Sequence, residues 1–510
     1  MSLIKSAFWR PAVFSTTKPA AWLYARLMST ASKKNATSIA NEGKTIANKQ
    51  QLYVIDHLSP GSIFFLPHGA RIFNRLVEFM RAQQRCYGFE EVVTPLIYKD
   101  DLWKTSGHWK HYKDDMFQVS AQHHKDTTAQ TTSEGETPET TTPSEPHTHT
   151  GPISDEDALQ IYGLKPMNCP GHCVMYSKHP HSFRDLPIRY SDFSPLHRNE
   201  SSGALSGLTR VRKFHQDDGH IFCLPSQIQA EIEGCLKMIQ ASYSVFKLNE
   251  FRFVLSTRPE SYAGSLEVWD KAEENLKQAL NNSGREWELN PGDGAFYGPK
   301  IDILVKDNNG KEHQTATIQL DFQLPQNFHL KYVTGSSTTD SATGAITPVE
   351  ETPVLIHRAI FGSLERFMAI LIDHFNGHWP FWLNPRQAVI IPIASRHHEY
   401  ASAIFSQLSG KYNFKYTYPS VSTSGSTDAI VLPELLHSRY FNVDLFDADE
   451  TVGARTRRAI SEGYSYIIVV GDKEMEDRKL SIRTRESRNT QYLDIDQTIS
   501  MFSQLEDAYQ

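Results

Sequence analysis

Residues 197–223 read HRNESSGALSGLTRVRKFHQDDGHIFC, and this stretch carries an order of chemistry that an exposed turn does not need. Arg198 and Glu200 precede a Gly/Ser-rich loop, and Arg210 and Phe214 follow it. Hydrophobic flanks on both sides of the loop predict an antiparallel hairpin with a long connection. Arginine offers planar, bidentate donors to phosphate oxygens, and an aromatic ring can stack on a base. The stretch therefore indicates a nucleotide-phosphate site on a hairpin; two strands joined by exposed salt bridges are the alternative.

The composition is that of a globular protein with two or three domains. The 510 residues are 39% hydrophobic and 22% charged, with a net charge of −7. That charge gives no general sign of nucleic-acid binding, so any RNA contact must depend on local basic patches. No apolar run approaches the roughly 18 residues that a membrane helix requires. Five scattered cysteines argue against a disulfide framework.

Residues 1–45 differ in composition from the rest of the chain. No Asp or Glu occurs before Glu42, whereas Lys and Arg recur among Ser, Thr, Ala and aromatic residues. This composition is typical of a mitochondrial transit peptide, although a disordered basic tail would share it. We therefore expect import into the mitochondrial matrix, and we exclude these residues from the fold.

Residues 52–383 are predicted to form one folded domain. Apolar side chains at helical spacing within residues 70–86 predict a helix that ends at Gly88. The following run EEVVTPLI, residues 90–97, is rich in β-forming residues. Its Pro95 should lie at a sheet edge or an interface, because proline lacks the donor that a central strand needs.

Two segments within this domain are predicted to be insertions. Residues 121–152 contain no Val, Ile, Leu, Met or aromatic residue, so they cannot offset their ordering entropy by burial. Residues 335–351 are rich in Ser and Thr and have the composition of a second, shorter insertion.

Residues 385–510 are predicted to form a second domain. Strand-like runs at residues 386–394, 441–447 and 464–471 alternate with segments of helical periodicity. Alternating strands and helices indicate a small parallel or mixed α/β domain.

The stretch at 197–223 resembles motif 2 of the class II aminoacyl-tRNA synthetases, and its wording is close to that of the threonyl enzymes. The resemblance covers residues 52–510 and implies an α+β fold, with a catalytic antiparallel sheet flanked by helices and a C-terminal α/β anticodon-binding domain. It also implies a homodimer through the catalytic domain, with Pro95 at the interface. Four further motifs are similar to the same family and occur in the same order: MNCPGH (167–172), FYGPKID (296–302), TIQLDF (317–322) and HRAIFGSLERF (357–367).

The resemblance implies a threonine–tRNA ligase reaction. Threonine and ATP would give threonyl-adenylate and pyrophosphate, and the threonyl group would then pass to the 3′ end of tRNA(Thr) in mitochondrial translation. Mg²⁺ would accompany the ATP, and one Zn²⁺ per subunit would bind the amino acid. Two alternatives are a prolyl- or seryl-type synthetase, which should lack the Cys/His/His set, and a non-catalytic synthetase-like protein, which should lack the phosphate-binding arginines.

The resemblance also assigns nucleotide contacts. Arg198 matches the arginine on the α-phosphate, where a fixed guanidinium group would stabilise the transition state electrostatically. Glu200 falls where the family reads the adenine amino group, and Phe214 where a ring lies beneath adenine. Beside the motif 3 arginine, Glu365 is either a magnesium ligand or a surface acid. The ATP-binding set is Arg198, Glu200, Arg210, Phe214, Gln314, Thr317 and Arg366, and the catalytic set is Arg198, Arg366 and Lys300.

Cys169, His220 and His357 match the zinc ligands of the threonyl enzymes. Their separations alone give no zinc signature, and each residue taken singly is more often structural. Three protein ligands leave one coordination position open. Zinc that takes both the amino and the hydroxyl group of threonine would reject valine, which an ordinary pocket discriminates only about a hundredfold. Cys173 is the rival ligand.

The remaining matched positions surround the amino acid or the tRNA. Asp218 would accept a hydrogen bond from the threonine hydroxyl. In the C-terminal domain, Glu476 and Arg485 match anticodon contacts, although residues 418–440 depart from the bacterial pattern. The threonine-binding set is Met167, Gln216, Asp218, Tyr297, Gln319 and Ser363.

Serine also carries a hydroxyl group, so the metal would not exclude it. Many family members carry an N-terminal editing domain against serine, and no such domain fits between the leader and residue 52. Serine activated in error would then be removed in the catalytic site, removed by another protein, or tolerated.

Overall fold

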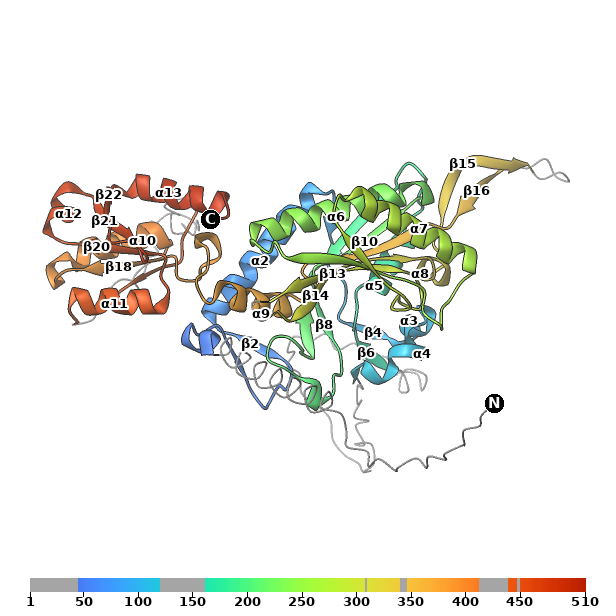
Figure 1. Cartoon of the computed structure of the whole chain (residues 1–510), viewed down its shortest axis with the longest axis horizontal. Helices are drawn as coiled ribbons and strands as arrows, with labels where there is room; N and C mark the ends of the chain where they lie inside the picture. The colour runs from blue at the N-terminus through green and yellow to red at the C-terminus, as the bar shows by residue number, and fades with distance from the viewer. Residues whose placement is uncertain (1–44, 120–160, 308–309, 340–345, 412–438, 447–449) are drawn as a thin grey trace, which may run out of the picture.

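The computed structural model of the protein describes residues 45–119, 161–307, 310–339, 346–411, 439–446 and 450–510. The leader up to residue 44, the predicted insertion 121–152 and most of residues 418–440 lie outside the described residues. Figure 1 shows a larger body around an eight-stranded sheet and a smaller C-terminal body around a five-stranded sheet. Among the described helices, none is both long and apolar enough to cross a membrane.

The larger body is built on a mostly antiparallel sheet. In the described strands, parallel pairing occurs only at its two ends, and this agrees with the expected catalytic sheet. In order across the sheet, the strands are β12 (Trp287–Asn290), β11 (Phe251–Ser256), β13 (Lys300–Lys306), β14 (Glu312–Asp321), β17 (Val354–Ala359), β10 (Asp218–Cys223), β7 (Ile188–Asp192) and β3 (Glu90–Glu91).

The strand register puts polar residues in rows on one face of this sheet. His220 on β10 lies opposite His357 on β17. His357 in turn lies opposite Gln319 on β14, and Gln319 lies opposite Lys300 on β13. Opposite residues point to the same face of a sheet, whereas neighbours along a strand point to the other face. Ile318, next to Gln319, accordingly points into the core and is fully buried.

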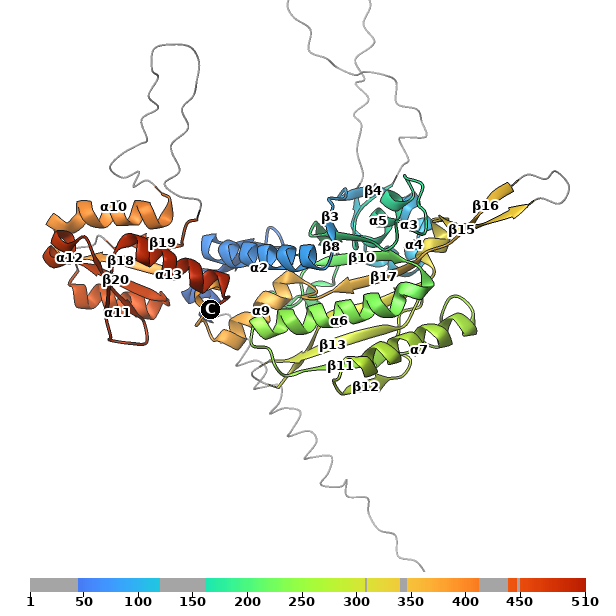
Figure 2. The ribbon, with the colours of Figure 1, turned by 90° about the horizontal axis from the view of Figure 1, so that it is seen from above.

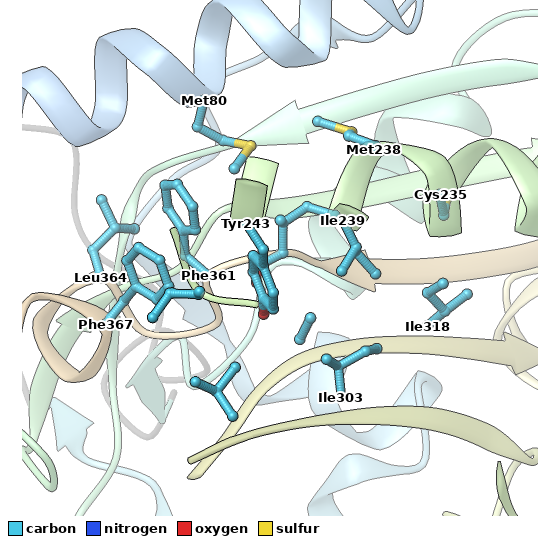
Figure 3. Packing of buried hydrophobic residues seen from close by; sticks show 14 of the residues in the cluster. Met80, Cys235, Met238, Ile239, Tyr243, Ile303, Ile318, Phe361, Leu364 and Phe367 are labelled. Carbon is cyan, nitrogen blue, oxygen red and sulfur yellow. The ribbon is translucent and has the colours of Figure 1, made fainter. Parts of the chain in front are cut away.

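Helices bury the other, apolar face of the sheet. In Figures 1 and 2, α6 and α7 lie across this face. Figure 3 shows Met80 of α2, Tyr243 of α6 and Phe367 of α9 in one cluster with Ile303 and Ile318 of the sheet. Burial of this cluster leaves the polar face free for chemistry. The helices are α2 (Pro67–Cys86), α6 (Ile228–Val245), α7 (Leu266–Asn282) and α9 (Leu364–Phe375).

Shorter elements complete the larger body. β8 (Pro195–His197) pairs antiparallel with β9 (Lys213–His215), so the hairpin predicted around residues 197–223 is confirmed. In Figure 1, α3, α4, α5 and the small sheet β4-β6-β5 lie on the side of the main sheet away from α6. The short elements are β1 (Tyr53–Ile55), β2 (Ile63–Phe65), β4 (Ile97–Lys99), α3 (Asp100–Thr105), α4 (His108–Tyr112), β5 (Gln118–Val119), β6 (Tyr162–Leu164), α5 (Cys169–Tyr176), α8 (Leu324–Asn327), β15 (Tyr332–Thr339) and β16 (Ile346–Glu351).

The C-terminal body confirms the predicted alternation of strands and helices. Its sheet has the order β19-β18-β20-β21-β22 and is mixed, because β18 runs parallel to β19 and β20 whereas β21 is antiparallel to β20 and β22. The elements are β18 (Ala388–Pro392), α10 (His398–Ser409), β19 (Val443–Leu445), α11 (Val452–Glu462), β20 (Tyr466–Val470), α12 (Asp472–Asp477), β21 (Leu480–Thr484), β22 (Gln491–Leu493) and α13 (Ile495–Asp507).

Of the secondary-structure predictions in the larger body, the helix is confirmed and the β-rich run is largely wrong. The helix predicted for residues 70–86 is confirmed as α2, which starts three residues earlier at Pro67. The run 90–97 was predicted to be β-rich, but only Glu90–Glu91 and the start of β4 are strands. The segment between them is irregular around Pro95, where the chain has no ladder donor. Of the predicted insertion 335–351, the described residues 335–339 and 346–351 belong to the paired strands β15 and β16.

Candidate active site and metal centre

Cys169, His220 and His357 come together on the polar face of the main sheet. The register puts the two histidines opposite each other, and Cys169 is the first residue of α5. One potential ligand atom of each residue lies within 4.8 Å of the others. Cys173 is fully buried and, among the described residues, is not part of this group of potential ligands. The geometry therefore favours Cys169 over its rival.

Hydrogen bonds behind the two imidazoles leave one nitrogen of each ring facing the other ring. His357 Nε2 lies 2.9 Å from Asp321 Oδ2. His220 Nδ1 lies 2.8 Å from His172 Nδ1. When both rings donate to these partners, their remaining nitrogens, His220 Nε2 and His357 Nδ1, present lone pairs 2.9 Å apart, and a proton or a cation must separate them. Burial lowers the pKa of His220 well below its ordinary value, which disfavours the proton.

The chemistry of these donors fits zinc. One sulfur and two imidazole nitrogens are ordinary zinc ligands, and three protein ligands form an open site. Burial raises the pKa of the Cys169 thiol well above its ordinary value, so the thiolate would need a cation beside it. Asp321, which is fully buried, occupies the position behind His357 from which a carboxylate orients a ligating ring.

Three predicted threonine contacts lie beside this cluster. Asp218 is buried, accepts a hydrogen bond from Asn168 Nδ2 at 2.8 Å, and has a pKa raised by burial. The Tyr297 hydroxyl donates to Gln319 Oε1 at 3.1 Å, and the Tyr297 ring lies 5.9 Å from the ring of His357. Within the described part of the chain, the buried Nε2 of Gln319 has no hydrogen-bond partner. An amide donor is thus left for a bound ligand.

The other predicted threonine contacts have structural partners already. Gln216 and Ser363 form an isolated antiparallel bridge. The Ser363 hydroxyl accepts from the backbone N–H of Arg366, which caps α9, and donates to Glu365 Oε2 at 3.1 Å. Met167 is partly buried against the apolar cluster that includes the first turn of α5.

Asp302 holds three predicted contacts together. Its side chain is 6% exposed and accepts hydrogen bonds from Lys300 Nζ at 2.6 Å and from Gln314 and Thr317. Lys300 also pairs with the exposed Asp293 at 3.2 Å. Burial alone would lower the pKa of Lys300, but the two carboxylates raise it overall, so its amine stays charged. Lys300, Gln314 and Thr317 therefore have positions set by one buried carboxylate.

Three arginines gather in the other half of the site. Burial lowers the pKa of Arg366, and the positive charges of Arg198 and Arg210 lower it further. The buried Nε of Arg366 has no hydrogen-bond partner in the described residues. Like charges held together repel one another until an anion joins them. This arrangement suits a polyphosphate.

The two residues predicted to hold adenine, Glu200 and Phe214, are each in contact with an arginine side chain. The Glu200 carboxylate accepts from Arg210 Nε at 2.9 Å and from Arg210 Nη2 at 2.8 Å. The guanidinium carbon of Arg198 lies 5.0 Å from the ring centre of Phe214, which packs against Leu196. Nucleotide binding at these residues would exchange one set of contacts for another.

Glu365 is not the surface acid that was one of its two expected roles. Its side chain is 1% exposed, and its carboxylate accepts hydrogen bonds from the backbone N–H of His215 at 3.0 Å and from Ser363. The ring nitrogen Nδ1 of His215 lies 2.9 Å from the same carboxylate. Both oxygens are thus engaged in joining α9 to β9, and this argues against the magnesium role as well.

The two predicted anticodon contacts lie at opposite ends of β21 in the sequence. Glu476 is exposed on α12, before β21 begins, whereas Arg485 follows the last residue of β21. Arg485 also donates to the carbonyl oxygen of Gly463 at 3.3 Å.

Comparison with known proteins supplies the family. The model of the tRNA synthetase class II core domain (G, H, P, S and T) matches residues 153–375, and that of the anticodon binding domain matches residues 387–505. The mitochondrial threonine–tRNA ligase of Saccharomyces cerevisiae is 45% identical to this chain, over 99% of this chain and 97% of its own length. The chain belongs to the threonine–tRNA ligase family. The predicted enzyme class, an ATP-using aminoacyl-tRNA ligase of class II, is confirmed, and so is the predicted fold.

Two further similarities extend this result within the threonine–tRNA ligases. A mitochondrial relative from Schizosaccharomyces pombe is 46% identical over 93% of this chain and 92% of its own length. A crystal structure described as the RNA-binding domain of threonyl-tRNA synthetase from Cryptosporidium parvum has a TM-score of 0.72 and 39% identity, and covers 91% of this chain and 98% of that one.

The sequence prediction missed the residues that hold the predicted contacts in place. His172 lies in the quoted motif MNCPGH, Asp321 in TIQLDF and Asp302 in FYGPKID. Their places in these motifs were a usable signal. What each one contacts depends on the register of distant strands, which the motifs do not give.

Proposed function

We propose that the protein attaches threonine to tRNA(Thr) in two steps. Threonine and ATP react to threonyl-adenylate and pyrophosphate, and the threonyl group then passes to the 3′ end of the tRNA. One observation carries the proposal, namely the buried cluster of Cys169, His220 and His357 beside a group of arginines. Asp218 next to this cluster lies within the electrostatic reach of Arg198, so the two halves of the site adjoin.

Cys169, His220 and His357 would hold one Zn²⁺ per subunit. When bound, the ion supplies a Lewis-acidic centre with open coordination for the amino and hydroxyl groups of threonine. Asp218 accepts a hydrogen bond from the same hydroxyl, and the free amide N–H of Gln319 meets an acceptor of the amino acid. Valine lacks the hydroxyl and leaves these groups unpaired, which costs it affinity.

The remaining threonine contacts orient the carboxylate. Lys300, held charged by Asp302, lies one strand beyond Gln319 in the same row and neutralises the carboxylate that attacks ATP. Tyr297 and Gln216 close the pocket around the amino acid, with Met167 and Ser363 at its edges.

The three arginines bind the triphosphate of ATP. Arg198 contacts the α-phosphate, where negative charge moves as the carboxylate attacks, and fixed guanidinium donors lower the energy of that transition state. Arg210 and Arg366 contact the terminal phosphates, and Mg²⁺ would accompany the ATP and offset the negative charge of its phosphates. Glu200 then releases Arg210 and accepts a hydrogen bond from the adenine amino group, above Phe214. Gln314 and Thr317, both bonded to Asp302, complete the nucleotide pocket.

We infer the assembly and the domain roles from an exposed apolar segment and from the two folded bodies. Val93 is 84% exposed and Leu96 and Ile97 are exposed beside Pro95, so this apolar segment supports a homodimer through the catalytic domain. Residues 52–383 act as the catalytic domain and residues 385–510 as the anticodon-binding domain, with Glu476 and Arg485 contacting bases of the anticodon.

The leader, residues 1–45, which has no acidic residue before Glu42, directs the protein to the mitochondrial matrix, and the mitochondrial threonine–tRNA ligases among its relatives support this location. The leader would be removed after import, and mature protein purified from mitochondria should lack it.

Pyrophosphate exchange with each of the twenty amino acids, measured together with the zinc content, tests the proposal. We expect strong exchange with threonine, weak exchange with serine, none with valine, and one zinc per subunit. Exchange that depends on proline or serine instead of threonine would refute the substrate, and full exchange by zinc-free protein would refute the role of the metal.

A further inference from the structure

A second histidine lies directly behind the proposed metal ligand His220. His172 is 0% exposed and sits on α5, in the same turn as Cys169. Its Nδ1 lies 2.8 Å from Nδ1 of His220, and the two rings meet edge to face with their centres 4.7 Å apart. One hydrogen atom must lie between these two nitrogens, so the protonation pattern of His172 dictates that of His220.

A buried carboxylate lies on the other side of His172. Asp192 Oδ2 is 3.8 Å from His172 Nε2, which has no hydrogen-bond partner within the described residues. Asp192 is itself held by the Thr94 hydroxyl at 2.7 Å, the backbone N–H of Ser194 at 2.7 Å and the amine of Lys165 at 3.6 Å. A carboxylate surrounded by donors in this way stays ionised and attracts the N–H of the ring to its own side.

This order of groups selects one tautomer for each ring. Asp192 favours a proton on Nε2 of His172, which leaves His172 Nδ1 as an acceptor. His220 then donates from Nδ1 and keeps the lone pair of Nε2 toward Cys169 and His357. We propose that His172 and Asp192 are positioning residues that fix His220 in the orientation and tautomer that bind the metal ion. The proposal rests on the metal site proposed above.

Zinc affinity, measured by competition with a chromophoric chelator, tests the proposal directly. His172→Phe keeps the ring volume and removes both nitrogens, and we expect its zinc dissociation constant to rise about 10- to 100-fold. His172→Asn keeps an acceptor close to the position of Nδ1, and we expect a smaller rise. The zinc dissociation constant of Asp192→Asn should lie between those of wild type and His172→Phe. His397→Phe removes another fully buried histidine, in the C-terminal body, and should bind zinc like wild type.

Kinetics separate positioning from a purely structural role. In His172→Phe we expect the KM for threonine to rise while the KM for ATP stays unchanged. A folded His172→Phe or Asp192→Asn protein with wild-type zinc affinity would overturn the proposal. If His172→Phe does not fold, the zinc affinities of His172→Asn and Asp192→Asn test the proposal instead. Wild-type protein that binds no zinc would instead refute the metal site itself, so the two failures are distinguishable.

Discussion

The metal half and the nucleotide half of the site differ in what holds their side chains. In the metal half, His220 and His357 each have a partner behind the ring, His172 and Asp321 respectively. In the nucleotide half, Arg210 pairs with Glu200 and the buried Nε of Arg366 has no partner in the described residues. The first set is positioned by the fold, whereas the second is arranged by exchangeable contacts.

This difference teaches where the effect of a substitution should be visible. Rigid neighbours preorganise a metal centre, so damage there should appear in the metal content of the free protein. Guanidinium groups gathered without an anion gain their full stabilisation only when a polyphosphate binds. Damage in that half should appear only in the kinetics with ATP.

Replacement of His357 by alanine should give the largest effect. It removes one of the three ligands, so we expect loss of bound zinc and a fall of threonine-dependent exchange by at least about 100-fold. Zinc analysis and pyrophosphate exchange measure both. Full zinc occupancy in a folded His357→Ala protein would show that His357 is not a metal ligand, and would contradict the separation of the site into a metal half and a nucleotide half. His397→Ala is the control for the loss of a buried histidine elsewhere.

Replacement of Arg366 by alanine should affect the nucleotide half alone. The terminal phosphates that Arg366 contacts leave as pyrophosphate, whose negative charge grows in the transition state; loss of a donor to such a charge costs about 10²- to 10³-fold in kcat, and we expect a loss of that size. Zinc content should equal that of wild type. A concurrent loss of zinc would show that the two halves are not independent.

Replacement of Asp302 by asparagine tests the boundary between the halves. Hydrogen bonds to a charged group contribute about 1.5–3 kcal/mol, so a roughly tenfold or greater loss of kcat/KM is expected as Lys300 loses its position. Asp293→Asn is the matched control, since its contact with Lys300 is exposed and such pairs contribute about 0–1 kcal/mol. Equal effects of the two substitutions would contradict a positioning role for Asp302.

Replacement of Glu200 by alanine should give the smallest effect. Loss of one hydrogen bond from adenine to a carboxylate amounts to about 1.5 kcal/mol, the lower end for a charged acceptor, so the KM for ATP should rise about tenfold while kcat changes little. Discrimination against GTP should weaken in parallel, because GTP carries no amino group at that position. Unchanged discrimination would mean that Glu200 serves Arg210 and not the base.

The sequence predicted the motifs and the order of elements, but not the contacts behind them. The run 197–223 gave the hairpin correctly because strand signals and turn residues are local. The run 90–97 was predicted to be rich in β-structure, but it is mostly irregular because Pro95 cannot donate a backbone hydrogen bond to a neighbouring strand. Glu365 could not be placed from sequence, since its burial depends on the approach of β9 to α9, more than a hundred residues apart along the chain.

The same limit explains why the metal ligands were easier to predict than their partners. Cys169, His220 and His357 each stand in a recognisable motif, whereas the roles of His172 and Asp321 arise from cross-strand register and helix docking. Register shifts move every side chain of a strand to the other face, so these contacts are properties of the folded sheet.

Visible spectroscopy of protein with Co²⁺ in place of zinc most directly tests selection of threonine by coordination. Threonine at saturating concentration should change the ligand-field spectrum of the cobalt, because its amino and hydroxyl groups enter the coordination sphere, while valine at the same concentration should leave it unchanged. A protein that binds threonine by calorimetry with an unaltered cobalt spectrum would contradict the account.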